Sequence, residues 1–168
     1  MSEKRWPEKL QKYGNSYGFE QIVHVFHGGE GSKTTHLGMK TINWIDQNRL
    51  RPAIIERDAI AQKSFLKAVK SSDKKEYLDQ SIASVRNQRH LWENSPNFPK
   101  KILRALQETR GFDSEFTFKT TGAGGEDAIF LLGLNNAIEP ARQKLATLGW
   151  REFKYNCQQE GLKINVEH

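Results

Sequence analysis

Residues 116–132 contain the pattern that most constrains the fold of this chain. Phe116 and Phe118 alternate with polar residues, which is the period of a half-buried strand. A glycine-rich stretch follows, and residues 128–132 then form a continuous apolar run that suits a central strand. The pattern predicts a β-hairpin, so the fold must contain a sheet and a helical layer that covers it.

An earlier strand and a block of helices precede this hairpin. The β-branched and aromatic run at residues 22–26 predicts a buried strand that ends at Gly28 and Gly29. Helical spacing then predicts four helices, which cover residues 32–48, 52–72, 73–92 and a short stretch around 102–106.

The second and third of these helices carry the clearest helical signals. Ile55, Ala59, Leu66 and Val69 lie close to one face of the second helix, with Phe65 beside them. The third helix opens with Asp73 and has Glu76 three residues later, which is the spacing of a capping box. The two helices suit an antiparallel pair.

The last third of the chain is predicted to be a helix with extended segments after it. The helix covers residues 139–148, with Pro140 in its first turn, and extended segments follow at 150–155 and 162–166. The order of elements predicts an α+β fold, with an antiparallel sheet and helices mainly on one of its faces. Residues 1–20 have no clean period and are expected to form an irregular leading segment before one domain over residues 21–168.

Composition sets broad limits on the class of protein. The single cysteine among the 168 residues, Cys157, cannot form an internal disulfide, and no apolar run approaches the length of a membrane span. We therefore expect a soluble, cytoplasmic protein without a membrane partner. The formal net charge of +6 favours acidic partners in general, although a solvated basic surface is the simpler explanation.

The glycine cluster between the two hairpin strands is the first candidate binding site. Thr120, Thr121, Gly122, Ala123, Gly124 and Gly125 lie there. Glycines let backbone N–H groups approach an oxyanion closely, and threonine hydroxyls can also donate, so the cluster can form a phosphate cradle. A tight or bulged hairpin connection without a ligand explains the same glycines.

A second candidate site follows the first predicted strand and opens a helix. It contains Ser32, Lys33, Thr34 and Thr35, a lysine and three hydroxyls at a helix N-terminus, which is a favourable place for an anion. The spacing does not match a Walker loop, because Ser32 stands where that loop requires glycine before the lysine.

The remaining polar groups predict less. The histidines are scattered, so no metal site is expected, and Cys157 has no Cys or His close to it in sequence. Arg86, Arg89 and His90 lie on the third helix, where they form either an anion-binding edge or a solvated helix face.

Residues 121–130 resemble the third motif of the GHMP small-molecule kinases, the superfamily that includes galactokinase, homoserine kinase and the mevalonate-pathway kinases. The run Thr-Gly-Ala-Gly-Gly, followed by Asp127 and Ala-Ile-Phe, is similar to the sequence of this motif in phosphomevalonate kinases. Gly28, Gly29, the hydroxyl cluster at residues 32–35 and Trp44 are also similar to these enzymes. Glu126 departs from the family pattern, because many members carry glycine at this position, and it adds a side chain and a negative charge to the loop.

The resemblance covers residues 20–168 and corresponds to the C-terminal domain of the family, whose fold is ferredoxin-like. It implies a domain of an ATP-dependent kinase of isoprenoid precursor synthesis. Its glycine loop, with Asp127, would approach a nucleotide and a small phosphorylated metabolite. ATP and Mg²⁺ would serve the full-length kinase, and none is expected to bind tightly to this chain alone.

The ATP-phosphate loop and the catalytic aspartate and lysine of the family belong to a preceding domain, which residues 1–20 do not resemble. The resemblance thus assigns no catalytic residue here, and we expect no kinase activity from this polypeptide by itself. Either the chain is cut from a complete kinase, which we favour, or it is a natural free-standing domain. The acceptor substrate and oligomeric state stay open.

An interaction module is the alternative function from a different class. A ferredoxin-like sheet with a basic surface can bind a regulatory ligand, a protein or nucleic acid. Phe116 and Phe118, on one face of a strand, would stack on RNA bases if that face were exposed. Packing of both rings beneath the helices is the more ordinary explanation, and nucleic acid is therefore not the expected partner.

Overall fold

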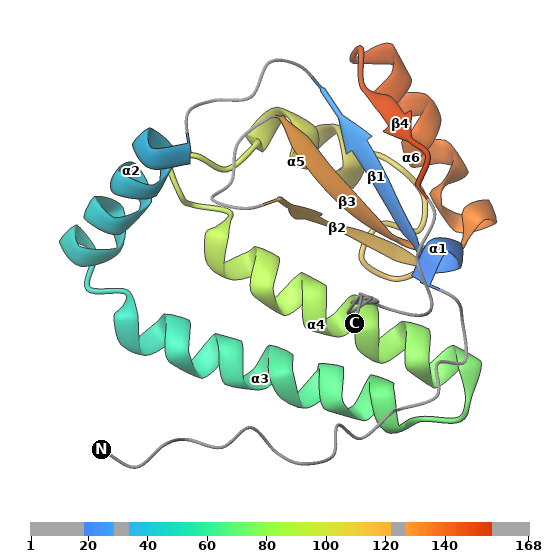
Figure 1. The fold of residues 1–168 in the computed structure, drawn as a ribbon, viewed down its shortest axis with the longest axis horizontal. Helices are drawn as coiled ribbons and strands as arrows, with labels where there is room; N and C mark the ends of the chain where they lie inside the picture. The colour runs from blue at the N-terminus through green and yellow to red at the C-terminus, as the bar shows by residue number, and fades with distance from the viewer. Residues whose placement is uncertain (1–18, 29–33, 122–126, 156–168) are drawn as a thin grey trace, which may run out of the picture.

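We describe residues 19–28, 34–121 and 127–155 of the chain, from a computed structural model. The elements follow one another as α1 (Phe19–Ile22), β1 (Val23–His27), α2 (Thr34–Gln47), α3 (Arg51–Lys70), α4 (Lys74–Trp92), α5 (Lys100–Gln107), β2 (Phe116–Thr120), β3 (Ala128–Gly133), α6 (Asn135–Thr147) and β4 (Arg151–Phe153) (Figure 1). The predicted extended segment at 162–166 lies outside the described residues.

The four strands form one antiparallel sheet in the order β2-β3-β1-β4. The hairpin β2-β3 is paired as the sequence predicts, and β1 lies between β3 and β4 although almost the whole helical block separates it from them in sequence. This strand order, with a helix before β2 and another before β4, confirms the α+β, ferredoxin-like fold.

One face of the sheet packs against α5 and α6 to form the larger core. The strand residues on this face alternate along each strand, as the period of two requires. They include Phe26, Phe116, Phe118, Ile129 and Leu131, and they meet Ile102, Leu106, Ile138 and Leu145 of the two helices. Each of these buried side chains contributes about 1.5 to 3 kcal/mol relative to an exposed one.

Part of the opposite face is covered by α4. Tyr77, Leu78 and Ile82 of α4 pack with Val23 and Leu132 of the sheet in a second, smaller core. The predicted cap of this helix is present, because Asp73 Oδ1 accepts a 2.7 Å hydrogen bond from the Glu76 N–H. Figure 1 shows α3 running beside α4 on the side away from the sheet.

The α3–α4 pair is present, but it uses a different face of α3 from the one with the most apolar residues. Ala61 and Ala68 are fully buried, and Ser84 of α4 donates a 2.8 Å hydrogen bond to the Ala61 carbonyl oxygen. Ile55 and Leu66, by contrast, are 70% and 49% exposed. Small side chains let the two backbones approach closely, which explains why the alanine face packs.

The last helix begins four residues before the predicted start. It starts at Asn135 rather than Glu139, so Pro140 lies inside the helix rather than in its first turn. The reason is the packing of Ile138, which is fully buried and shares an apolar stripe with Ala141 and Leu145. A helix that began at residue 139 would leave Ile138 outside that stripe.

The connection after α4 holds α2 in place. The Asn97 side-chain amide donates to the Leu37 carbonyl oxygen at 2.6 Å and to the Thr41 hydroxyl at 2.8 Å. The rings of Trp44 and Trp92 lie 6.4 Å apart, centroid to centroid. These contacts fix α2 against the end of α4.

Candidate functional site

The two glycine-containing segments that the sequence singles out meet at one end of the sheet. His27 of β1 pairs with Ala128 of β3, and the next residue, Gly28, donates a 3.0 Å hydrogen bond from its N–H to the Asp127 carbonyl oxygen. The end of β1 and the start of β3 are therefore adjacent. We call this place the Gly28–Asp127 end of the sheet.

Several predicted site residues lie outside the described residues, namely Ser32, Lys33, Gly122, Ala123, Gly124 and Gly125. Thr34 and Thr35 are the first two residues of α2. Their backbone N–H groups belong to the first turn of a helix, where N–H groups lack helical acceptors and favour an anion.

Thr120 and Thr121 close the hairpin. Thr120 is the last residue of β2 and pairs with Ile129. The Thr121 N–H and hydroxyl both donate to the Ala128 carbonyl oxygen, at 3.3 and 3.2 Å. The Thr121 hydroxyl thus has an internal acceptor, and its first role here is to fix the start of the connection to residue 127.

Asp127 carries an unsatisfied buried atom. Its Oδ1 is buried and has no hydrogen-bond partner, which holds for no other buried side-chain nitrogen or oxygen in the described ranges. A buried carboxylate oxygen without a donor is unfavourable. A ligand that donates a hydrogen bond, or a cation, would remove that penalty, so Asp127 Oδ1 is a candidate ligand contact.

Gly28 is required by a close approach between β1 and the residue that leads into β4. A Cβ atom on Gly28 would lie 2.2 Å from Cε2 of the buried Trp150 ring, well inside contact distance. The absence of a side chain therefore lets the indole cover the end of β1. This is a local reason for a glycine here that does not depend on a ligand.

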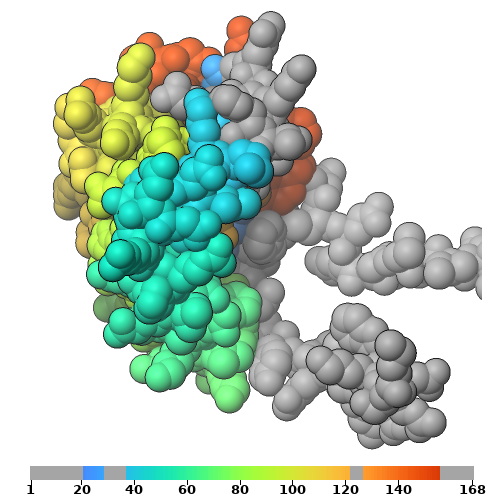
Figure 2. All heavy atoms as spheres, turned by 90° about the vertical axis from the view of Figure 1, so that its left-hand side faces the viewer, coloured from blue at the N-terminus to red at the C-terminus, as the bar shows by residue number. Residues whose placement is uncertain are grey.

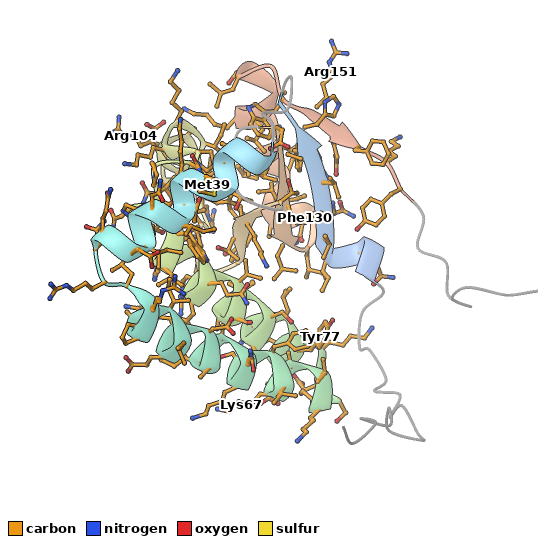
Figure 3. All side chains as sticks on the ribbon, turned by 60° about the vertical axis from the view of Figure 1, so that its left-hand side comes forward. Met39, Lys67, Tyr77, Arg104, Phe130 and Arg151 are labelled. Carbon is orange, nitrogen blue, oxygen red and sulfur yellow. The ribbon has the colours of Figure 1, made fainter. Side chains whose placement is uncertain are left out.

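Two residues at this end were not predicted as site residues. His27 pairs with Arg151 across β1 and β4, and both side chains are exposed. Figure 3 shows Arg151 extending outward at the start of β4. The pairing of β1 with β4 is long-range in sequence, and no local pattern marks Arg151 as a neighbour of Gly28.

A separate polar cluster joins β1, β4 and α6. Nδ1 of His24, which is 5% exposed, lies 3.2 Å from Glu152 Oε1, and its Nε2 lies 3.2 Å from the Gly133 carbonyl oxygen. Arg142 donates to Glu152 from Nε at 2.8 Å and also pairs with Glu139. The groups lie beside a hollow of about 370 Å³ and satisfy one another, which indicates a structural role.

The pKa of Glu152 reflects this cluster. Burial raises it, but the hydrogen bond and charge of Arg142, together with His24, outweigh burial and hold the pKa below its ordinary value. Glu152 is therefore an ionised partner for Arg142 at neutral pH, not a proton donor.

Arg89 does not form an anion-binding edge. It is 3% exposed, and its guanidinium donates to Glu93, to both carboxylate oxygens of Asp113 and to the Thr117 hydroxyl. The guanidinium also lies over the Phe112 ring, 4.8 Å from its centroid. Neither sequence interpretation holds for this residue, because the side chain is neither solvated nor available to an external anion.

Phe116 and Phe118 cannot stack on bases, because both side chains are fully buried beneath α5 and α6. Within the described part of the chain, no three His, Cys, Asp or Glu side chains form a group that could hold a metal ion. None of the helices in these ranges combines the length and apolarity needed to cross a bilayer. Cys157 lies outside the described residues.

Comparison with known proteins supports the fold and leaves function open. No family model matches the chain, and neither does any curated protein sequence. A solved structure, the crystal structure of a Lin0012 protein from Listeria innocua, matches 81% of this chain with a TM-score of 0.63 and 13% sequence identity. The chain spans only 39% of the length of that protein. At this identity the likeness shows a shared fold.

Proposed function

We propose that this chain is the C-terminal domain of an ATP-dependent GHMP-type small-molecule kinase, similar to phosphomevalonate kinase. In this proposal the Gly28–Asp127 end of the sheet forms one wall of the site that holds the phosphates of nucleotide and substrate. The observation that supports it best is the 3.0 Å hydrogen bond from Gly28 to Asp127. It joins Gly28 to Asp127, and each of these two residues belongs to a part of the sequence that resembles this family.

The groups at this end suit phosphate recognition. Arg151 provides a positive charge one residue pair from Gly28, and the N–H of Gly28 and the N–H and hydroxyl of Thr121 lie at the strand ends beside it. Phosphoryl transfer depends chiefly on positioning and on stabilisation of charge, so a wall of this kind contributes without a catalytic base of its own.

Asp127 has a distinct role in this proposal. A carboxylate repels a phosphate, so its unpaired Oδ1 is suited to a ligand hydroxyl or a cation. In the whole kinase, Mg²⁺ bound with ATP would neutralise phosphate charge. A carboxylate oxygen of aspartate is a common ligand of this ion, either directly or through a water molecule. The chain alone is expected to bind such ligands weakly and not to turn over.

Amide chemical-shift mapping of the chain by NMR tests this proposal. ATP with Mg²⁺, phosphomevalonate and mevalonate are titrated separately to millimolar concentration. We expect saturable shifts from the two phosphorylated ligands at Gly28, Thr121 and Asp127, and smaller shifts from mevalonate. No shift at these amides, or shifts confined to other elements, would overturn the proposal.

A matched pair of variants sharpens the test. Arg151→Gln should weaken binding of the phosphorylated ligands several-fold, because it removes one exposed charge beside the site. Arg104→Gln removes one exposed charge from α5 and should leave the binding constants unchanged. Equal effects of the two variants would mean that general charge attraction, rather than a site at this end, holds the ligand.

A further inference from the structure

Helix α3 carries a second apolar row that the described part of the chain does not cover. The row consists of the apolar residues Ile55, Ala59, Leu66 and Val69 with the polar Gln62 at its centre, and its members follow one another at alternating intervals of four and three residues. This is the spacing of the contact positions in a coiled coil. Figure 2 shows α2, in cyan, and the N-terminal part of α3, in teal, at the surface that faces the viewer.

The row lies beside the face of α3 that packs on α4, and it is not part of that face. Ala61 and Ala68 occupy the buried side of α3, while Ile55 is the most exposed large apolar residue of the helix. Burial of an isoleucine or leucine side chain is worth about 1.5 to 3 kcal/mol each. An exposed row of contact positions on a helix that is already held in place is ready to pair with a second helix.

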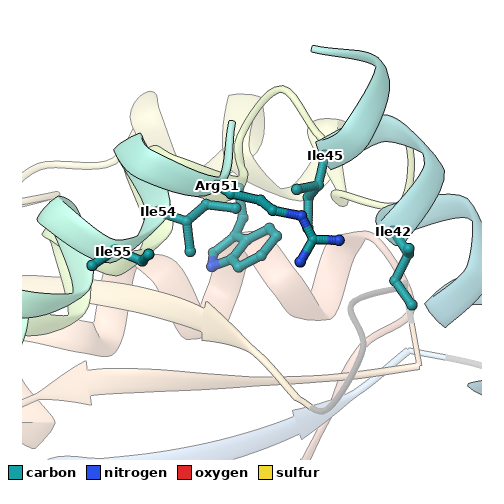
Figure 4. Close-up of a pocket in the computed structure, with 6 residues that line it drawn as sticks. Ile42, Ile45, Arg51, Ile54 and Ile55 are labelled. Carbon is teal, nitrogen blue, oxygen red and sulfur yellow. The ribbon is translucent and has the colours of Figure 1, made fainter. Parts of the chain in front are cut away.

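A hollow adjoins the N-terminal end of this row. It has a volume of about 270 Å³ and is lined by Ile42, Ile45, Arg51, Ile54, Ile55 and Trp92 (Figure 4). Arg51 is the one charged residue of the lining, and Asp46 pairs with it at 2.8 Å. A concave apolar surface of this size fits a projecting side chain of a protein, whereas a flat lipid surface would leave it unfilled.

The charges along α3 favour one orientation of a partner helix. After Arg51, the first half of the helix contains Glu56, Arg57 and Asp58, which include both acidic residues of α3, whereas the charged residues of the second half are all lysines, Lys63, Lys67 and Lys70. Parallel helices of this sequence would place the lysines together. Antiparallel helices bring Glu56 of one copy near Lys63 of the other and align the helix dipoles favourably.

We infer that the apolar row of α3 docks against the same row of a second copy of this chain, antiparallel and related by a two-fold axis between Ala59 and Gln62. In this register Ile55 of each copy meets Leu66 of the other, and Ala59 meets Gln62. Leu66 and Val69 of the second copy then lie beside the hollow next to Ile55. The contact is isologous, as a two-fold axis requires. This inference does not depend on the proposed function.

Sedimentation equilibrium of the full chain, from micromolar to millimolar concentration, tests the contact. We expect a monomer–dimer equilibrium whose dissociation constant rises at least about tenfold in the double variant Ile55→Glu with Leu66→Glu. Ile60→Glu is the matched control, because Ile60 is 43% exposed on the same helix but lies off the row. It should change the constant by less than about twofold. Circular dichroism checks that each variant stays folded.

Two further measurements report orientation. Glu56→Lys and Lys63→Glu should each weaken the dimer, and the two together should restore it. In a Cys157→Ser background, cysteines placed at Ile55 and Leu66 lie about 16 Å apart within one helix, too far for a disulfide. A disulfide between positions 55 and 66 would therefore join two copies in the antiparallel register. A disulfide between position 55 of one copy and position 55 of the other would overturn that register.

The inference fails if the chain stays monomeric at millimolar concentration, or if the row variant and the Ile60→Glu control dimerise equally. It also fails if the monomer binds vesicles rich in phosphatidylserine and the row variant alone abolishes that binding. In that case the row contacts anionic lipid. Binding of an acidic helix from another protein to a monomeric chain would overturn it in the same way.

Discussion

Arg89 and Asp113 meet in a two-point contact, with Nη1 donating to Oδ1 at 2.7 Å and Nη2 donating to Oδ2 at 2.5 Å. The pair joins the last turn of α4 to the turn that leads into β2. It therefore connects the helical pair α3–α4 to the sheet through charge as well as through apolar packing.

Removal of the arginine should be strongly destabilising. Arg89→Met leaves the Asp113 carboxylate half-buried without its cation, which typically costs about 3 to 5 kcal/mol. Urea unfolding measures the loss. Arg104→Met, at an exposed position on α5, is the control and should stay within about 0.5 kcal/mol of the parent. A loss below about 1 kcal/mol for Arg89→Met would show that water replaces the guanidinium easily.

The same pair predicts how stability depends on pH. Burial raises the pKa of Asp113, but the hydrogen bond and charge of Arg89, with the Thr117 hydroxyl, hold it below its ordinary value. A carboxyl with a lowered folded-state pKa stabilises the fold above its unfolded pKa of about 3.9. That contribution is lost as the pH falls through the folded pKa. Glu152 acts in the same direction.

We therefore expect the free energy of unfolding to fall steeply with pH below about 4. Asp113→Asn should flatten this dependence, and asparagine also tolerates the positive φ of 63° at this position. Asp79→Asn alters an exposed carboxyl of α4 and should keep the parental slope. Urea titrations across the acidic pH range give the slope of the free energy of unfolding against pH. Equal slopes for the two variants would contradict the conclusion that Asp113 causes part of this pH dependence.

Local signals predicted the elements well, because each depends on residues close in sequence. The capping pair Asp73 and Glu76 marked the start of α4, and the alternation of Phe116 and Phe118 marked β2. The start of α6 was missed because Ile138 is drawn into the core by residues far away in the chain.

The sites were harder to predict, because they depend on which strands are neighbours. Nothing local states that β1 pairs with β3, and that pairing alone brings Gly28 to Asp127. Arg89 was misjudged for a similar reason, since its main partner Asp113 lies on a turn beyond α5. On α3, the count of apolar residues pointed to one face, while the small residues Ala61 and Ala68 decided the packing.

The cap of α4 gives a local test of helix stability. Asp73→Ala removes the acceptor of the Glu76 N–H and should reduce the free energy of unfolding by about 1 kcal/mol. Asp73→Ser keeps an acceptor and should restore most of it. Asp79→Ala, inside the same helix and exposed, serves as the control in thermal unfolding. An equal melting temperature for Asp73→Ala and Asp79→Ala would mean that the cap contributes nothing measurable.

A pair of glycine substitutions separates packing from backbone effects at the Gly28–Asp127 end. Gly28→Ala places a Cβ 2.2 Å from the Trp150 ring, so the ring or the end of β1 must shift. Overpacking of this kind costs about 1 to 3 kcal/mol. Gly38→Ala on α2 meets no atom within 4 Å, and alanine should stabilise that helix by up to about 1 kcal/mol.

The two variants should thus change the melting temperature in opposite directions, with Trp150 fluorescence altered only by Gly28→Ala. The shift of β1 also moves the Gly28 N–H away from the Asp127 carbonyl oxygen, which should speed hydrogen exchange of the Gly28-position amide. Because the proposed phosphate site is built on this hydrogen bond, Gly28→Ala should weaken ligand binding while Gly38→Ala leaves it intact. Retention of full stability and exchange protection in Gly28→Ala would show that the indole can move aside freely, and that this glycine does not set the geometry of the site.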